Sequence, residues 1–253
     1  MDHEQYCALT EAEITRMSQV TTGVTPETPV PGCPEWTLAR LIKHTGIVHR
    51  WCAAIVATRA TGPVAQNALD VALPADPNEY PAWLAAGAAP LVTVLRDAGP
   101  DTPVWSWAAA GGTGWWARRM LHETTVHRAD AELSVGIAPE IDPVVAADGI
   151  SEFLQVVRMG SRPSKRLAEL PSGHAIHLHA TDDGLGESGE WLISLADGDF
   201  TWSHGHAKGT VAVRGPAALL LLLAYGRVRP DDERLTVFGD EAVLASWQGL
   251  MTL

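Results

Sequence analysis

Three residues that could ligate a metal ion lie on one face of a predicted helix. Residues 115–135 contain no proline or glycine and are rich in good helix formers. At ~100° per residue, Glu123, His127 and Asp130 fall on the same side as the large apolar residues of this segment. That side is expected to face a core, where an unpaired charge is strongly unfavourable. The carboxylates and the imidazole therefore need partners.

The spacing of Glu123 and His127 suits two different arrangements. Four residues are about 6 Å along the helix axis, which lets both side chains converge on one cation. The same spacing also suits a simple hydrogen-bonded pair inside a hydrated bundle. Arg128 and Glu132 point to the opposite side of the helix. The helix alone leaves both arrangements open.

Composition excludes several classes of protein. A net charge of −12 argues against nucleic acid as a partner. Three cysteines without CxxC spacing predict neither a disulfide framework nor a thiolate zinc site. The longest apolar run, residues 217–225, is too short for a bilayer span of about 20 residues, and the start MDHEQ lacks the features of a secretory signal. We therefore expect a cytoplasmic protein without a membrane partner.

The first half of the chain predicts four helices joined by loops. Their apolar spacing places them at residues 2–20, 38–59, 78–98 and 115–135. Thr37 is a suitable N-cap for the second helix, and Pro90 is expected to kink or interrupt the third. Helices with ligand-type residues facing inward are typical of a four-helix bundle.

After residue 138 the pattern becomes mixed. Helices are predicted at residues 141–159, 216–225 and 240–250, and strands at residues 174–181, 190–196, 199–204, 209–215 and 234–238. Asp197-Gly198 indicates a tight hairpin, and residues 160–166 form a basic connection. We therefore expect an α+β fold, with a bundle in residues 1–138 and, in residues 139–253, a domain whose sheet is mostly antiparallel.

For two groups of histidines, periodicity alone does not decide whether they bind a metal. His44 and His49 lie on opposite shoulders of the apolar face of the second helix, each ~70° from its centre, so the spacing does not choose between them as a ligand. In the segment 174–179, His177 and His179 share one strand face, a spacing that could bind a metal. A hydrated sheet face is the more ordinary interpretation, and we favour it.

Two long segments resemble the mycothiol-dependent maleylpyruvate isomerase family. They are VPGCPEWTLARLIKHTGIVHRW at residues 30–51 and RRMLHETTVHRADAELSVG at residues 118–136. The segment from residue 209 onward, with VAVRGPAALLLLLAYGR and VFGDEAVL, is similar to the C-terminal domain of that family. The resemblance covers nearly the whole chain and implies that the N-terminal half is a DinB-like four-helix bundle.

The resemblance also implies a divalent metal, usually zinc, held by His44, Glu123 and His127. His49 and His122 do not match ligand positions and are interpreted as surface or helix-flank histidines. Three protein ligands leave one tetrahedral position open, which is typical of catalytic zinc, although the same ligand set also suits iron, nickel or cobalt. A thiol that enters the open position is deprotonated by the cation.

Two other residues are candidates for supporting roles. Asp130 lies about one turn beyond His127 and is a candidate hydrogen-bond acceptor that orients a ligand imidazole. The alternative is an ion pair between Asp130 and Arg118 or Arg119. Arg227 matches an arginine that the family places near the active site, where a guanidinium suits a substrate carboxylate or a developing enolate. The alternative for Arg227 is a surface arginine after a helix.

The implied function is that of a mycothiol-dependent metalloenzyme acting on a small electrophile, either an isomerase or an S-transferase. In the isomerase, the thiol adds to a cis double bond, rotation follows, and elimination gives the trans isomer. Because the thiol comes from mycothiol, Cys33 and Cys52 are interpreted as packing residues. The alternatives are a non-catalytic protein that binds an apolar ligand and carries a structural metal, or a metal-dependent hydrolase. We expect a monomer or a homodimer.

Overall fold

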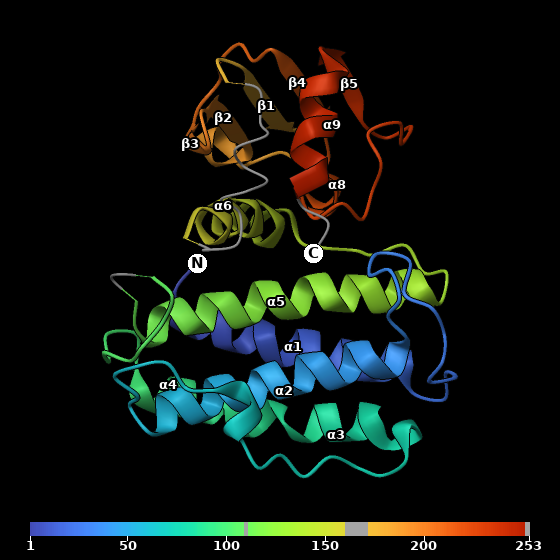
Figure 1. Ribbon diagram of the computed structural model, residues 1–253, viewed down its shortest axis with the longest axis vertical. Coiled ribbons are helices and arrows are strands. Elements are labelled where there is room, and N and C mark those ends of the chain that lie inside the picture. Colours follow the sequence, from blue (N-terminus) through green and yellow to red (C-terminus); the bar gives the residue numbers. More distant parts are fainter. Residues whose placement is uncertain (109–110, 160–171, 251–253) are drawn as a thin grey trace. The chain divides into compact units, whose positions relative to one another are not determined.

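The structure is a computed structural model that describes residues 1–108, 111–159 and 172–250. The chain divides into two compact units, Met1–Pro139 and Glu140–Leu253, and each is described by itself. The first unit is helical and the second combines helices with a sheet, which confirms the predicted α+β class (Figure 1). The basic connection at 160–166 lies outside the described residues. Within the described ranges, no helix is both long and apolar enough to cross a bilayer.

The first unit is a four-helix bundle, as predicted. Its helices are α1 (His3–Thr21), α2 (Leu38–Ala57), α3 (Tyr80–Ala86), α4 (Ala88–Ala98) and α5 (Thr113–Ser134), with single turns η1 (Gln66–Ala68) and η2 (Pro77–Glu79) between α2 and α3. Helices α1 and α2 each pack against both α4 and α5, so α1, α2, α4 and α5 are the four helices that surround one core (Figure 1). The side chain of Thr37 accepts a hydrogen bond from the Arg40 amide, which confirms the predicted N-cap of α2.

The third predicted helix is interrupted, but not at Pro90. The break lies at Gly87, and Pro90 falls in the first turn of α4, where its missing N–H costs little. At the break, the Arg50 guanidinium donates to the Trp83 carbonyl (2.7 Å). A Cβ added at Gly87 would lie 2.8 Å from Arg50 Nη1. The position of the break therefore follows from the close approach of a side chain on α2.

Helix α5 is buried on both sides rather than on one. Opposite Glu123, the side chains of Arg128 and Glu132 are almost fully buried against α1. Arg128 forms ion pairs with Glu132 (2.6 Å) and with Glu13 of α1 (2.6 Å). Charges on this side are thus neutralised by a neighbouring helix rather than by solvent.

The second unit contains a five-stranded sheet in the order β3-β2-β1-β4-β5. Its elements are α6 (Pro143–Met159), β1 (Ala175–Ala180), η3 (Gly186–Gly189), β2 (Glu190–Ala196), β3 (Asp199–His204), β4 (Val211–Gly215), α8 (Ala217–Ala224), β5 (Thr236–Gly239) and α9 (Glu241–Leu250). Only β1 and β4 pair in parallel among these strands, which confirms a mostly antiparallel sheet. The predicted hairpin joins β2 and β3, with Gly198 at φ +72°.

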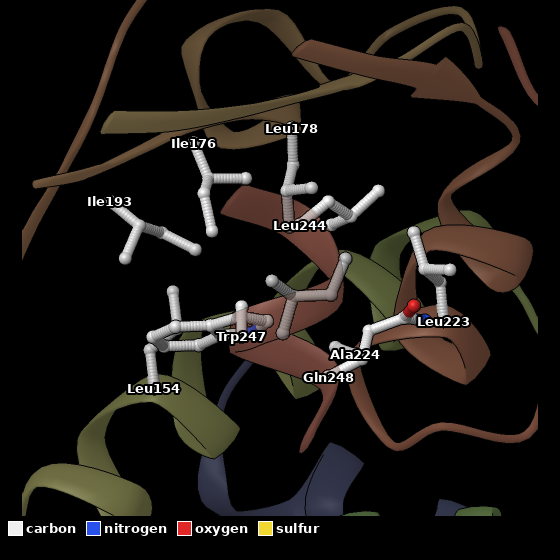
Figure 2. A pocket seen from close by; sticks show the side chains of 10 residues that line it. Leu154, Ile176, Leu178, Ile193, Leu223, Ala224, Leu244, Trp247 and Gln248 are labelled. Carbon is white, nitrogen blue, oxygen red and sulfur yellow. The ribbon is translucent and has the colours of Figure 1, made fainter. Parts of the chain in front are cut away.

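One face of this sheet makes the core of the second unit. Ile176 and Leu178 of β1 and Ile193 of β2 point toward the helices and line a cavity of about 10 Å³ together with Leu223 of α8 and Trp247 of α9 (Figure 2). That volume is close to the space of a single water molecule. The alternate residues of β1, among them the histidines, therefore lie on the opposite face.

The buried ion pairs of α5 predict a large effect on stability. Arg128→Met is expected to lower the free energy of unfolding by about 3 kcal/mol or more, because the Glu13 and Glu132 carboxylates lose the cation that they share. Arg96 and Glu4 also join two helices, but this pair is exposed, so Arg96→Met should lower the free energy of unfolding far less than Arg128→Met. Urea unfolding of both variants measures the difference, and equal losses would contradict the assignment.

Candidate metal centre

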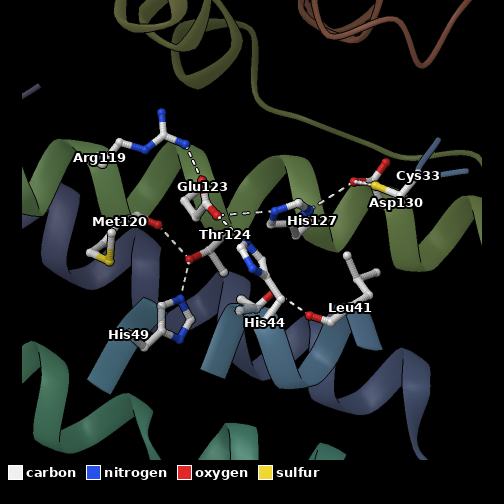
Figure 3. Close-up of polar contacts among 11 residues, drawn as sticks. Cys33, Leu41, His44, His49, Arg119, Met120, Glu123, Thr124, His127 and Asp130 are labelled. Atoms are coloured by element: carbon white, nitrogen blue, oxygen red, sulfur yellow. Dashed lines mark hydrogen bonds and ion pairs between the residues drawn. The ribbon is translucent and has the colours of Figure 1, made fainter. Parts of the chain in front are cut away.

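Helices α2 and α5 bring three of the predicted ligands together. Glu123 Oε1 lies 3.1 Å from His44 Nε2 and 3.2 Å from His127 Nε2. One donor atom from each residue falls within 4.8 Å of the other two. Figure 3 shows the two imidazoles converging on the Glu123 carboxylate from separate helices. His44 is the most open of the three, with 35% of its side chain exposed, so the group is reached from the His44 side.

The separations within this group match those of a tetrahedral metal site. Ligand atoms that lie 2.0–2.1 Å from a tetrahedral ion are about 3.3 Å from one another. The two measured separations to Glu123 Oε1 are close to that value. Two imidazole nitrogens and one carboxylate oxygen also form a donor set that zinc accepts. The residues present therefore fit a divalent metal.

Arg119 holds the second oxygen of Glu123. Its guanidinium forms an ion pair with Glu123 Oε2, while Oε1 faces His44 and His127 (Figure 3). Burial acts to raise the pKa of Glu123, but Arg119 and His127 outweigh burial and hold the pKa well below its usual value. Glu123 is thus ionised and oriented.

Asp130 lies where it can fix the ring of His127. Its Oδ2 is 3.0 Å from His127 Nδ1, so that nitrogen donates to the carboxylate and Nε2 is left to face Glu123. Burial acts to lower the pKa of His127, but Glu123 and Asp130 outweigh burial and raise the pKa to about 9. The Cys33 thiol also donates to Asp130 (3.5 Å). Cys33 therefore has a polar contact in addition to the packing role predicted for it.

His49 is buried and bonded, not a surface or flank histidine. Its Nε2 lies 2.9 Å from Thr124 Oγ1, and the Thr124 hydroxyl donates to the Met120 carbonyl (2.6 Å) (Figure 3). A hydroxyl has one proton to donate, so His49 Nε2 must carry the proton that Thr124 accepts. Burial lowers the pKa of His49 to about 3, which keeps the imidazole neutral.

The surface or flank interpretation is also wrong for His122. Its side chain is 1% exposed, and its ring packs edge-on against Tyr6 of α1. The cause is the burial of α5 on both sides, which places even its flank residues inside the bundle. Neither His49 nor His122 belongs to the group formed by His44, Glu123 and His127.

A turn before α2 brings an aromatic wall to the site. The Trp36 ring lies edge-on to His44 (5.1 Å between centroids) and stacks on His127 (6.3 Å, 22° between planes). The residue before it, Glu35, has φ +66°, a left-handed conformation that is uncommon for a side chain of this type. This turn also carries Cys33, so the unusual backbone places two residues beside the candidate ligands.

An open pocket of about 460 Å³ lies on the exposed side of His44. Trp36, Arg40, Lys43 and Tyr80 contribute to its lining. The Arg40 guanidinium lies 4.8 Å from the centre of the Trp36 ring. The pocket thus combines an aromatic wall with two cations next to a candidate metal ligand.

Several of these contributors were not predicted from the sequence. Arg119 stands four residues before Glu123, and this i,i+4 spacing alone was a signal for their ion pair. On α2, Arg40 lies about one turn before His44, and Lys43 is the residue immediately before His44. Their positions around the helix relative to His44 could therefore also be predicted from the sequence. Nothing in the sequence pattern indicated that Thr124 would meet His49.

Arg227 lies in the second unit, just after α8, where its Nη1 donates to the Tyr225 carbonyl (2.7 Å). Its side chain is half-buried. The structure brings His44, Glu123, His127 and Asp130 together within the first unit.

Comparison with known proteins assigns both units to one family. A model described as the mycothiol maleylpyruvate isomerase N-terminal domain matches residues 8–132, and one described as the MDMPI C-terminal domain matches residues 144–246. Among solved structures, a mycothiol-dependent maleylpyruvate isomerase and its histidine-to-alanine mutant each have a TM-score of 0.58 at 15% identity, covering 94% of this chain and 93% of theirs. At that identity the likeness shows the fold alone. No curated protein matches.

The buried, neutral state of His49 predicts a pH dependence of stability. Its pKa is about 3 in the folded chain against 6.5 ordinarily, so the unfolded chain takes up a proton first and stability falls as the pH drops below 6.5. Above pH 6.5 this contribution is fully present. In metal-free protein, the free energy of unfolding should fall between pH 6.5 and about pH 5. The His49→Gln variant should show a fall that is smaller by about 2 kcal/mol. Urea unfolding at both pH values tests this, and equal pH dependence in the variant would contradict it.

Proposed function

This chain belongs to the mycothiol maleylpyruvate isomerase family, and on that premise we propose that it is an enzyme that uses a divalent metal and mycothiol to act on a small electrophile. The observation that carries the proposal is the convergence of His44, Glu123 and His127 on one point. Zinc is the metal that the donor set and the spacing favour. When bound, the cation lowers the pKa of an incoming thiol so that a thiolate forms near neutral pH.

The remaining residues prepare the ligands. Arg119 fixes one oxygen of Glu123 and leaves the other directed at the two imidazoles. Asp130 accepts the Nδ1 proton of His127 and so presents Nε2. Side chains that are held in this way lose little conformational freedom when a metal binds. Carboxylates that are hydrogen-bonded to a ligand imidazole commonly orient the imidazole in metal sites.

The pocket beside His44 supplies a place for the reactants. Arg40 and Lys43 are exposed at its wall and attract anionic groups of a thiol cosubstrate or of an electrophile with carboxylates. Trp36 offers an apolar surface that shields one side of the candidate ligands from water. The pocket volume of about 460 Å³ is in the range of small-molecule sites.

The reaction that we propose is addition of the mycothiol sulfur to the electrophile. For isomerisation, the sulfur and a proton add across a cis carbon–carbon double bond, the resulting single bond rotates, and elimination returns the thiol and the trans isomer. For S-transfer, the new carbon–sulfur bond is kept. We further propose that the first unit is the metal-binding domain and that Arg227 of the second unit contacts a carboxylate or enolate of the substrate.

The apolar-ligand alternative draws no support from the cavity in the second unit. Its volume of about 10 Å³ is far below that of a fatty acyl chain or a sterol (Figure 2). A metal-dependent hydrolase would use the same three ligands with water in place of the thiol. Turnover of esters or amides without any thiol would favour that alternative.

Removal of a ligand should abolish both metal binding and thiol-dependent turnover. We expect His44→Ala, Glu123→Gln and His127→Ala each to lower zinc affinity by more than the loss of about 10–100-fold typical of a residue that only orients a ligand. Mycothiol-dependent isomerisation of maleylpyruvate should fall in parallel. Elemental analysis and a thiol-dependence assay measure the two effects, with Glu27→Gln, an exposed carboxylate, as the control. Unchanged metal affinity in all three variants would overturn the proposal.

A positioning role for Asp130 predicts a change that depends on pH. Asp130 orients His127 but also raises its pKa, and a metal competes with the proton on that ring below about pH 9. Asp130→Asn should therefore weaken zinc binding by about 10–100-fold above pH 9, where orientation alone counts. Near pH 6 the loss of zinc affinity should be smaller, because the His127 ring of the variant also binds its competing proton less tightly.

Competition titrations in zinc buffers at both pH values measure this difference. Asp76→Asn, an exposed aspartate far from α5 in the sequence, serves as the control. A deficit in the Asp130 variant that is the same at both pH values would indicate a merely structural role.

A further inference from the structure

A second group of possible metal ligands lies in the second unit. Its members are His177 and His179 of β1, Glu190 of β2 and His206 of the loop between β3 and β4. Glu190 carboxylate oxygens lie 2.5 Å from His177 Nε2, 2.9 Å from His179 Nδ1 and 3.1 Å from His206 Nδ1. One donor atom from each of the four residues lies within 4.8 Å of all the others.

Strand geometry brings three of the four together. His177 and His179 alternate with Ile176 and Leu178, which point into the core, so both histidines lie on the opposite face (Figure 2). In the antiparallel register of β1 and β2, His179 is the direct partner of Glu190. Directly opposed residues place their side chains close together on one face.

The loop that carries His206 is tied to the same two strands. At its start, the Gly205 amide donates to the Glu190 carbonyl (3.4 Å), and at its end the Thr210 amide donates to the Ala175 carbonyl (2.7 Å). A Cβ added at Gly209 would lie 2.9 Å from the His177 amide nitrogen, so only glycine permits this approach. The loop therefore holds His206 over the two strand histidines.

The group is closed on its inner side and open on its outer side. His177 is 4% exposed, and 14% of the Glu190 side chain is exposed, whereas the His206 side chain is 76% exposed. Burial acts to raise the pKa of Glu190, but hydrogen bonds from His179, His206 and His177 outweigh it, so the pKa is lowered and the carboxylate is ionised. On this strand face His177 is buried, whereas His179 is partly exposed, as a hydrated face would have it.

We propose that His177, His179, Glu190 and His206 form a second divalent-metal site, suited to zinc and separate from the centre in the first unit. Three imidazole nitrogens and one carboxylate oxygen complete a tetrahedral set, because zinc takes four such ligands at 2.0–2.1 Å. A set closed by protein ligands is typical of a structural site, whereas the three ligands of the first unit leave a position open.

The consequence of such a site is local. A bound ion would link β1, β2 and the loop at residues 205–210 through their side chains, in addition to the backbone hydrogen bonds that already join them. Ions that bind only the folded state stabilise it. The competing explanation is a metal-free cluster in which the Glu190 carboxylate accepts hydrogen bonds from the three imidazoles, because a carboxylate offers several acceptor sites.

The test uses the full chain with the first centre disabled. In the double variant His44→Ala, His127→Ala, any tightly bound ion reports the second site alone. Titration with Co²⁺ should give about one ion per chain and the visible absorption bands of a four-coordinate cobalt ion with imidazole ligands. Adding His179→Ala or Glu190→Gln should remove this signal. Absence of tight cobalt binding in the double variant, with circular dichroism unchanged, would overturn the proposal.

Two further variants separate the loss of a ligand from the loss of the fold. His206→Ala removes an exposed ligand without touching the core, and it should weaken binding roughly tenfold or more while the chain stays folded. His174→Ala, just before β1 and outside the group, is the matched control and should bind cobalt like its parent. Equally tight cobalt binding in the His206 and His174 variants would show that His206 is not a ligand and would overturn the four-ligand site. Because activity is not the readout, failure of the thiol reaction would leave this result unaffected.

Discussion

The ionised carboxylate of Glu123, largely buried between two helices, is the constraint on which the first unit depends. Burial alone would be strongly unfavourable for this charge. The charge persists because Arg119 holds one oxygen while His44 and His127 face the other. In the metal-free chain the charge is balanced by a guanidinium and a protonated imidazole. A divalent cation bound at this point, as proposed, would compete with the proton of His127.

The two groups of ligand-type residues differ in a way that suits different roles. In the first unit, three donor atoms come from two helices, and the exposed side of His44 faces an open pocket with Trp36 and two cations. In the second unit, four donor atoms come from two strands and a loop fixed to them. As proposed metal sites, the first would leave one coordination position for a reactant, whereas the four protein ligands of the second would suit a structural ion.

Burial of α5 on both sides explains most departures from the sequence predictions. Arg128 and Glu132 find partners on α1, and His122 packs against Tyr6, so polar residues on this helix do not mark a solvent face. A hydrophobic pattern cannot reveal this arrangement, because Arg128 and Glu132 also pair with α1 residues that are distant in sequence. The break at Gly87 has a similar origin in Arg50 of a neighbouring helix.

Local patterns in the sequence determined the bundle, the mostly antiparallel sheet and the side of α5 that carries Glu123, His127 and Asp130, because helical and strand periods fix the direction of each side chain about its own axis. Only the resemblance to a known family pointed to His44 rather than His49. Tertiary structure decided that His44 meets Glu123 while His49 meets Thr124, and that a loop residue, His206, joins the strand histidines. Periodicity gives the angle of a residue around its element, but the packing of one element on another decides what lies opposite it.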